Sequence, residues 1–170
     1  MNILKKLITI FIVLFIFIPT SYSQDQIVYL DLDNVVNSTK AGKIILNKLE
    51  KSKSNALLKF KNKEQELKKI ESEINKQKNI ISDDELKKKL VEFRKEVSNF
   101  RQERQKVISD FNQKKKMEFE EFFKKITPII QNYVNEKNID MVLDRKNVFV
   151  ASKEKNITQE IIKIIDTKIK

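Results

Sequence analysis

Between Gly42 and Pro128 the chain runs for 85 residues without a glycine or a proline. These two residue types are the strongest helix breakers, and they cost about 1 and 3 kcal/mol in a helix interior. The stretch is rich instead in Lys, Glu, Leu, Gln and Ile. The sequence therefore predicts an extended helical rod rather than a compact enzyme core.

Each half of this rod carries apolar residues at the alternating three- and four-residue spacing of a coiled-coil seam. Seven of nine seam positions are apolar in the first half, and seven of eight in the second. The first seam is Leu46, Leu49, Lys53, Ala56, Phe60, Lys63, Leu67, Ile70 and Ile74. The second is Leu86, Leu90, Phe93, Val97, Phe100, Arg104, Val107 and Phe111. Two seams predict two helices that pack against each other.

A capping box separates the two halves. The hydroxyl of Ser82 can accept a hydrogen bond from the backbone N–H of Glu85, and the carboxylate of Glu85 can accept one from the N–H of Ser82. A helix needs such a cap only where it begins, so the rod is predicted to turn at residues 79–82. The result is an antiparallel helical hairpin with Ser82 and Glu85 as the cap at its tip.

Short apolar segments flank the rod and are predicted to be strands. They are Ile27–Leu32, Ile139–Leu143 and Val148–Ala151, with a polar connection over residues 33–38 that can contain one helical turn. Thr158 can cap a final amphipathic helix.

The predicted fold is therefore mostly α with a small β body, from which the long coiled-coil hairpin projects as an arm. Residues 39–121 form the arm, and residues 24–38 together with 122–170 form the body. The body is too small for a self-sufficient core, so we expect it to be the site of oligomerisation, with its strand edges covered by other copies.

Residues 1–23 are predicted to be a secretory signal peptide. Two lysines precede an apolar run over residues 7–18, and small residues stand at Ser21 and Ser23. Cleavage is expected between Ser23 and Gln24. The alternative is an uncleaved membrane anchor, but the apolar run is shorter than the roughly 20 residues that span a bilayer.

The composition argues against an enzyme. The chain has no histidine and no cysteine, which removes the imidazole base, the thiol nucleophile, disulfides and the usual zinc ligands. Its carboxylates are scattered along predicted helix faces, with no apolar pocket to tune them. We expect no catalytic activity, no cofactor and no metal site.

The charge is concentrated in the rod. Residues 40–137 carry 26 basic and 16 acidic side chains, a net charge of +10. Only four of the basic residues in the whole chain are arginines, whereas a nucleic-acid reader would favour arginine. We therefore expect no nucleic-acid partner, and an acidic partner or an anionic membrane surface stays open.

Three segments resemble the Skp/OmpH family of periplasmic chaperones, and the similarity extends over essentially the whole mature chain. They read IVYLDLDNVVNSTKAGKIILNKLE, ITPIIQNYVNEKNIDMVLDRKNVFVAS and NITQEIIKIIDTKI. The resemblance implies a periplasmic homotrimer whose three hairpins surround a central cavity. It also implies an ATP-independent holdase that keeps unfolded outer-membrane β-barrel proteins from aggregating on their way to the outer membrane.

Within this hypothesis, apolar residues near the arm base line the cavity and contact clients. The candidates are Phe111, Phe119, Phe122 and Phe123. Lysine runs attract acidic clients, anionic lipid or lipopolysaccharide. The candidates are Lys87, Lys88, Lys89, Lys114, Lys115 and Lys116. The alternative for each phenylalanine is a place in the seam or body core, and for each lysine run a solvated helix face.

Two other classes of function remain open from the sequence. One is a structural periplasmic coiled coil, such as a spacer or the hairpin of an efflux adaptor, although an adaptor would carry Gly-rich β-domains. The other is a protein that binds an anionic membrane or an envelope polymer through its basic arms.

Overall fold

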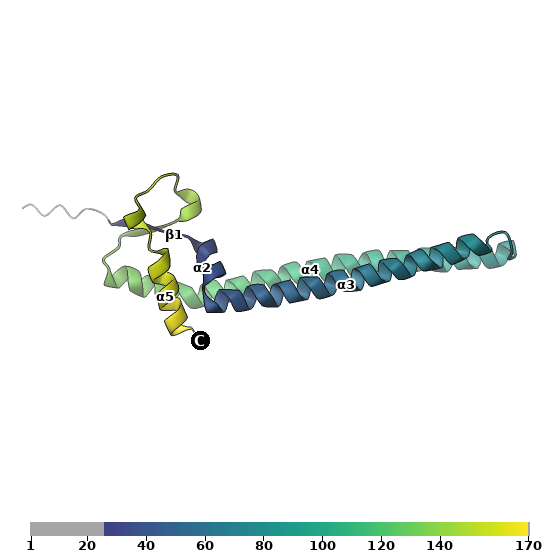
Figure 1. Ribbon diagram of the computed structural model, residues 1–170, viewed down its shortest axis with the longest axis horizontal. Helices are drawn as coiled ribbons and strands as arrows, with labels where there is room; N and C mark the ends of the chain where they lie inside the picture. The colour runs from purple at the N-terminus through teal and green to yellow at the C-terminus, as the bar shows by residue number, and fades with distance from the viewer. Residues whose placement is uncertain (1–25, 170) are drawn as a thin grey trace, which may run out of the picture.

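The computed structural model describes residues 26–169, so the predicted signal peptide and its cleavage site at Ser23 and Gln24 lie outside the described residues. Within this range the fold is mostly helical with a small two-stranded sheet, which confirms the predicted fold class. A long helical hairpin projects from a small body (Figure 1). None of the helices between residues 26 and 169 is long and apolar enough to cross a membrane.

Two antiparallel helices form the arm, α3 (Lys40–Gln77) and α4 (Asp83–Glu136). The 38 residues of α3 span about 57 Å at 1.5 Å per residue. Helix α4 has 54 residues, so it runs past the start of α3 and into the body. It also continues through Pro128. The two helices are separated by residues 78–82, where the sequence predicts the turn.

The seam of the arm is anchored at its middle by an aromatic and charged cluster. The rings of Phe60 and Phe100 meet edge to face with centroids 6.1 Å apart. The guanidinium of Arg104 lies 5.5 Å from the centroid of the Phe60 ring, and its Nη1 lies 3.2 Å from Oε1 of Glu64. These contacts set the register of α3 against α4, with Phe60 opposite Phe100.

A short helix, α2 (Leu32–Ser38), occupies the segment that was predicted to be a polar connection. The side chain of Asp31 caps it by accepting a hydrogen bond from the N–H of Asn34 at 2.8 Å. Two of its residues, Val35 and Val36, are buried. The helix has seven residues and thus exceeds the single helical turn expected in this connection, because this N-cap and this apolar pair together favour helix over a polar loop.

Thr39 joins α2 to α3. Its backbone N–H donates to the carbonyl of Val35 at 3.1 Å, and its hydroxyl accepts from the N–H of Gly42 at 3.1 Å. The same residue therefore ends one helix and caps the next, which explains why a threonine is fully buried here. Gly42, the only glycine in the chain, lies against the end of α2.

The body contains β1 (Ile27–Leu30), β2 (Met141–Asp144) and α5 (Thr158–Lys168). The two strands pair in parallel with Ile27 opposite Met141, although the whole arm separates them in sequence. Two 3₁₀ turns, Arg145–Asn147 and Lys153–Lys155, lie between β2 and α5.

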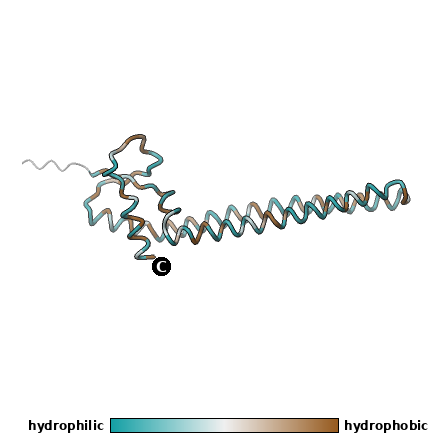
Figure 2. Tube along the Cα trace, in the orientation of Figure 1, coloured by the Kyte–Doolittle hydropathy of each residue, from teal (hydrophilic) through white to brown (hydrophobic). Residues whose placement is uncertain are grey.

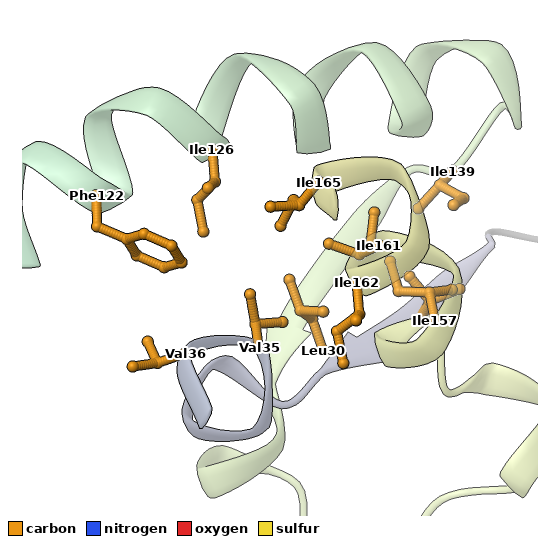
Figure 3. Close-up of a cluster of buried hydrophobic side chains, with 11 residues drawn as sticks. Leu30, Val35, Val36, Phe122, Ile126, Ile139, Ile157, Ile161, Ile162 and Ile165 are labelled. Atoms are coloured by element: carbon orange, nitrogen blue, oxygen red, sulfur yellow. The ribbon is translucent and has the colours of Figure 1, made fainter. Parts of the chain in front are cut away.

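A single apolar core joins β1, α2, the end of α4 and α5 (Figure 3). Its members with no exposed surface are Val35, Ile126, Ile161 and Ile165. Because α4 contributes Phe122 and Ile126 to this core, the base of the arm is part of the body. The arm is therefore anchored in the core of the body.

Two predictions for the body are wrong. Val148–Ala151 is not a strand, because no strand of residues 26–169 lies beside it, and Phe149 is 99% exposed. Thr158 does not cap α5 with its side chain, since its hydroxyl instead accepts from the N–H of Asp31 at 3.0 Å. The side chain of Asn156 accepts from the N–H of Thr158 at 3.0 Å.

Candidate functional site

The four phenylalanines predicted near the arm base differ in exposure. Phe122 is 3% exposed and belongs to the body core, so its ring is a packing element rather than a free surface. Phe119 and Phe123 are partly buried against the same core. The ring centroids of Phe122 and Phe123 are 5.5 Å apart. Phe111 is also partly buried. These four phenylalanines therefore contribute mainly to packing within the protein.

A groove at the base of the arm is the candidate site. It consists of two hollows that share Glu118 and Glu121. The first, of about 200 Å³, lies between the beginning of α3, α4 and the end of α5. The second continues along α4 toward the tip. The residues that line this basal groove are Ala41, Ile44, Ile45, Asp110, Gln113, Lys114, Met117, Glu118, Glu121, Phe122, Lys125 and Ile169.

Apolar side chains in the basal groove are open to solvent. Ile44 is 64% exposed and Met117 is 59% exposed. Neither belongs to the two predicted seams, and both stand in helices in which hydrophilic and hydrophobic residues alternate along the chain (Figure 2). Phe122 lines the first hollow only through the small part of its ring that remains accessible. An apolar segment of another chain that binds here would therefore remove both its own apolar surface and that of Ile44 and Met117 from water.

The charged rim of the first hollow of the basal groove is paired within the arm. Lys48 donates to the carboxylate of Glu118, and Nζ of Lys125 lies 2.8 Å from Oε1 of Glu121. The hydrogen bond from Lys125 lowers the pKa of the Glu121 carboxyl below its ordinary value, with a further contribution from the positive charge of that lysine. A rim whose charges are already compensated has little preference for the sign of a bound segment.

The two predicted lysine runs do not form one surface. Lys114, Lys115 and Lys116 are exposed near the base, and Lys114 lines the basal groove. Lys87, Lys88 and Lys89 lie near the tip, about 40 Å away along α4. Lys89 is partly buried in a small hollow between the arm helices.

At the tip, the hydroxyl of Ser82 accepts from the N–H of Glu85 at 3.3 Å. Three acidic residues follow Ser82 in the first turn of α4, where the helix dipole favours them. Sequence reasoning missed Ile80, which is 81% exposed at this turn. The apolar end of the arm is visible in Figure 2.

Sequence reasoning also missed the exposed apolar residues of the arm itself, because it followed only the seam. The signal that would have found them is an isoleucine, leucine or methionine outside the heptad positions of a lysine-rich helix. Five such residues are Ile44, Leu57, Leu58, Ile108 and Met117. Residues 26–169 contain no group of three or more side chains suited to hold a metal ion.

Comparisons with known proteins agree with this architecture. The family described as Outer membrane protein (OmpH-like) matches residues 26–165. A crystal structure from Caulobacter crescentus CB15, of a protein proposed to be an OmpH-like outer membrane chaperone, is similar with a TM-score of 0.76. The similarity covers 86% of this chain and 87% of that one at 15% sequence identity, and thus concerns the fold alone. A search of curated proteins found no match.

Proposed function

The chain belongs to the OmpH-like family, and we propose that it is an ATP-independent periplasmic holdase for unfolded outer-membrane β-barrel proteins. Two findings support a chaperone role. The family match extends over nearly all of the described residues, and the fold is shared with a protein proposed to be an outer membrane chaperone. The predicted signal peptide supports a periplasmic location.

The observation that carries this proposal is the basal groove. Unfolded β-barrel strands alternate apolar and polar residues and pair edge to edge when they meet. A surface that protects many such sequences must offer apolar contact without demanding one pattern of charge. The exposed Ile44 and Met117 beside the paired charges of Glu118 and Glu121 fit that requirement.

The small size of the basal groove suits release without ATP. A leucine-sized side chain that is fully removed from water gains about 1.5–3 kcal/mol, so one groove binds a client segment weakly. Several arms in one assembly hold several segments of the same client at high effective concentration. The client is then retained as a whole, while each contact stays easy to break.

Self-association into a homotrimer is part of the proposal. The segment Val148–Ala151 has strand-forming side chains but no partner strand among residues 26–169. Phe149 is 99% exposed and Val150 is 80% exposed. Such a segment is suited to add to the sheet of another copy. Three copies arranged in this way would surround a cavity with their arms.

The direct test is suppression of the aggregation of an unfolded outer-membrane β-barrel protein diluted from urea. The mature protein is expected to suppress light scattering near stoichiometric concentration without ATP. The double variant Ile44→Ser/Met117→Ser is expected to suppress it less. Val91→Ser is the matched control, because Val91 is 58% exposed on the arm outside the basal groove.

The results of this assay distinguish the holdase proposal from the proposed client site. If the wild-type protein leaves aggregation unchanged, the holdase proposal is wrong. If the wild type is active but the groove variant equals the Val91→Ser control, the groove is not the client site. Light scattering coupled to size-exclusion chromatography measures the mass of each variant, and a monomer at micromolar concentration would contradict the cavity mechanism.

Anionic lipid or lipopolysaccharide is a second proposed partner, favoured by the exposed run Lys114–Lys116. Binding to vesicles that contain phosphatidylglycerol, without client, should weaken as salt rises. Equal binding to uncharged phosphatidylcholine vesicles would refute this electrostatic attraction. Client-free binding as strong as client binding would instead favour a membrane-binding function over the holdase.

A further inference from the structure

Apart from the cluster of Phe60, Phe100 and Arg104, the seam of the arm is loosely packed over one segment. No residue between positions 50 and 66 of α3 or between positions 101 and 121 of α4 is buried. The cause lies in the sequence of the seam, which has Lys53, Ala56 and Lys63 in α3 and Arg104 in α4 at positions that are otherwise apolar. Small or charged residues at these positions leave little surface to bury between the two helices.

Exposed apolar side chains concentrate in this same segment. Leu57 is 56% exposed, Leu58 is 58% exposed and Ile108 is 47% exposed. Each of the three side chains leaves apolar surface in water on a charged arm, and each such exposure has a free-energy cost.

The register of the hairpin places Leu57 and Ile108 on one flank. Each follows a seam position by one residue, Leu57 after Ala56 and Ile108 after Val107, and in antiparallel coiled coils such positions share a flank. Glu64 follows Leu57 by one heptad, and it reaches Arg104 of the facing helix at 3.2 Å. Leu58 continues this surface around the outside of α3. We call Leu57, Leu58 and Ile108 the flank strip.

The flank strip is bracketed by positive charge. Lys53 and Lys61 lie four residues before and after Leu57, the spacing at which helix side chains are neighbours. Neither lysine forms an ion pair within residues 26–169. This environment differs from the first hollow of the basal groove, where the charged rim is paired.

The size of the flank strip decides between two kinds of occupant. A stable interface between subunits buries about 800 Å² on each side, which three partly exposed side chains do not supply. A segment of unfolded chain needs only a few apolar contacts at a time. The uncompensated lysines add attraction for carboxylates in that segment.

We propose that the flank strip is a second client-contact surface, selective for apolar segments that carry acidic residues. The inference rests on the proposed holdase function. It gives the flank strip a charge preference that the first hollow of the basal groove lacks. An extended client strand places apolar side chains on Leu57 and Ile108 while its carboxylates approach Lys53 and Lys61.

The test compares two peptides with the same alternating apolar residues, one with glutamate and one with lysine at the polar positions. The glutamate peptide is expected to bind the wild type more tightly. The double variant Leu57→Ser/Ile108→Ser is expected to weaken its binding by about tenfold, because two partly exposed apolar side chains are lost. Lys53→Gln/Lys61→Gln should remove the preference for glutamate and reduce the salt dependence.

Controls keep the two proposals distinguishable. Val91→Ser should bind like the wild type, and circular dichroism and mass measurement should show that every variant keeps its helices and its oligomeric state. If the wild-type protein protects the β-barrel client, but the wild type and all variants bind both peptides equally, the proposal for the flank strip is wrong and the holdase proposal stands. Wild-type protein that protects no client and binds neither peptide would overturn the holdase function itself.

Discussion

Gly42→Ala is the most informative single substitution, because two physical effects oppose each other there. Gly42 lies in the first turn of α3, and alanine is favoured over glycine in a helix by up to about 1 kcal/mol. Helix propensity alone therefore predicts a more stable protein. The tertiary structure predicts the reverse.

The steric effect is larger than the propensity. A Cβ on Gly42 would lie 2.7 Å from the carbonyl carbon of Val36, nearer still to its oxygen, and 2.8 Å from Oγ1 of Thr39. The obstacle is backbone of α2, so relief requires α2 to move. Val35 of that helix has no exposed surface, and Val36 is buried in the same core. Overpacking of this kind costs typically about 1–3 kcal/mol.

The expected net result is a loss of up to about 2 kcal/mol in the free energy of unfolding, after about 1 kcal/mol of helix propensity is subtracted. Urea denaturation followed by circular dichroism measures this change at a fixed protein concentration, since association also contributes to stability. Lys43→Ala is the control, because Lys43 is exposed in the same turn. Gly42→Ala that equals or exceeds the wild type in stability would refute the steric argument.

Three further predictions concern other parts of the chain. Ile126→Ala should lower the free energy of unfolding by about 2–5 kcal/mol in urea denaturation, because Ile126 is fully buried in the core; a loss below 0.5 kcal/mol would contradict its place there. Ser82→Ala should cost about 1 kcal/mol and speed hydrogen exchange at the start of α4, whereas unchanged exchange would show that the cap is dispensable. Because Lys125 lowers the pKa of Glu121 in the folded state, the contribution of this pair is present above the ordinary carboxyl pKa and is lost as pH falls through the lowered one. NMR titration should show that Lys125→Gln raises the pKa of Glu121, and an unchanged value would exclude the pair as the cause.

The prediction of the arm from sequence succeeded because its determinants are local. The absence of helix breakers, the heptad spacing and the serine at position 82 act within a few residues of one another, so they can be read along the chain. The seam pairs Phe60 and Phe100 follow from that spacing once the turn is known. The same local rules failed for Val148–Ala151, because a strand requires a partner that the described chain does not supply.

The candidate site was less accessible to sequence reasoning. Phe122 was a candidate contact because it lies in an apolar cluster near the arm base, yet it packs between α4 and the rest of the body. Which face of α4 turns inward is decided by the position of α5 and α2, two elements distant in sequence. The exposed Ile44 became a candidate only when the arrangement of α3, α4 and α5 showed a hollow between them, and Met117 lines the adjoining hollow along α4.

The sequence by itself determined that this chain is a basic helical hairpin on a small mixed body, since composition, periodicity and capping are properties of neighbouring residues. Only the tertiary structure decided which apolar side chains are core and which remain open to solvent, because burial depends on elements brought together from opposite ends of the chain. The lone Gly42 shows the difference. In the sequence it marks the start of the long stretch without helix breakers. In the fold its missing side chain leaves the space in which Val36 and Thr39 join the arm to the body.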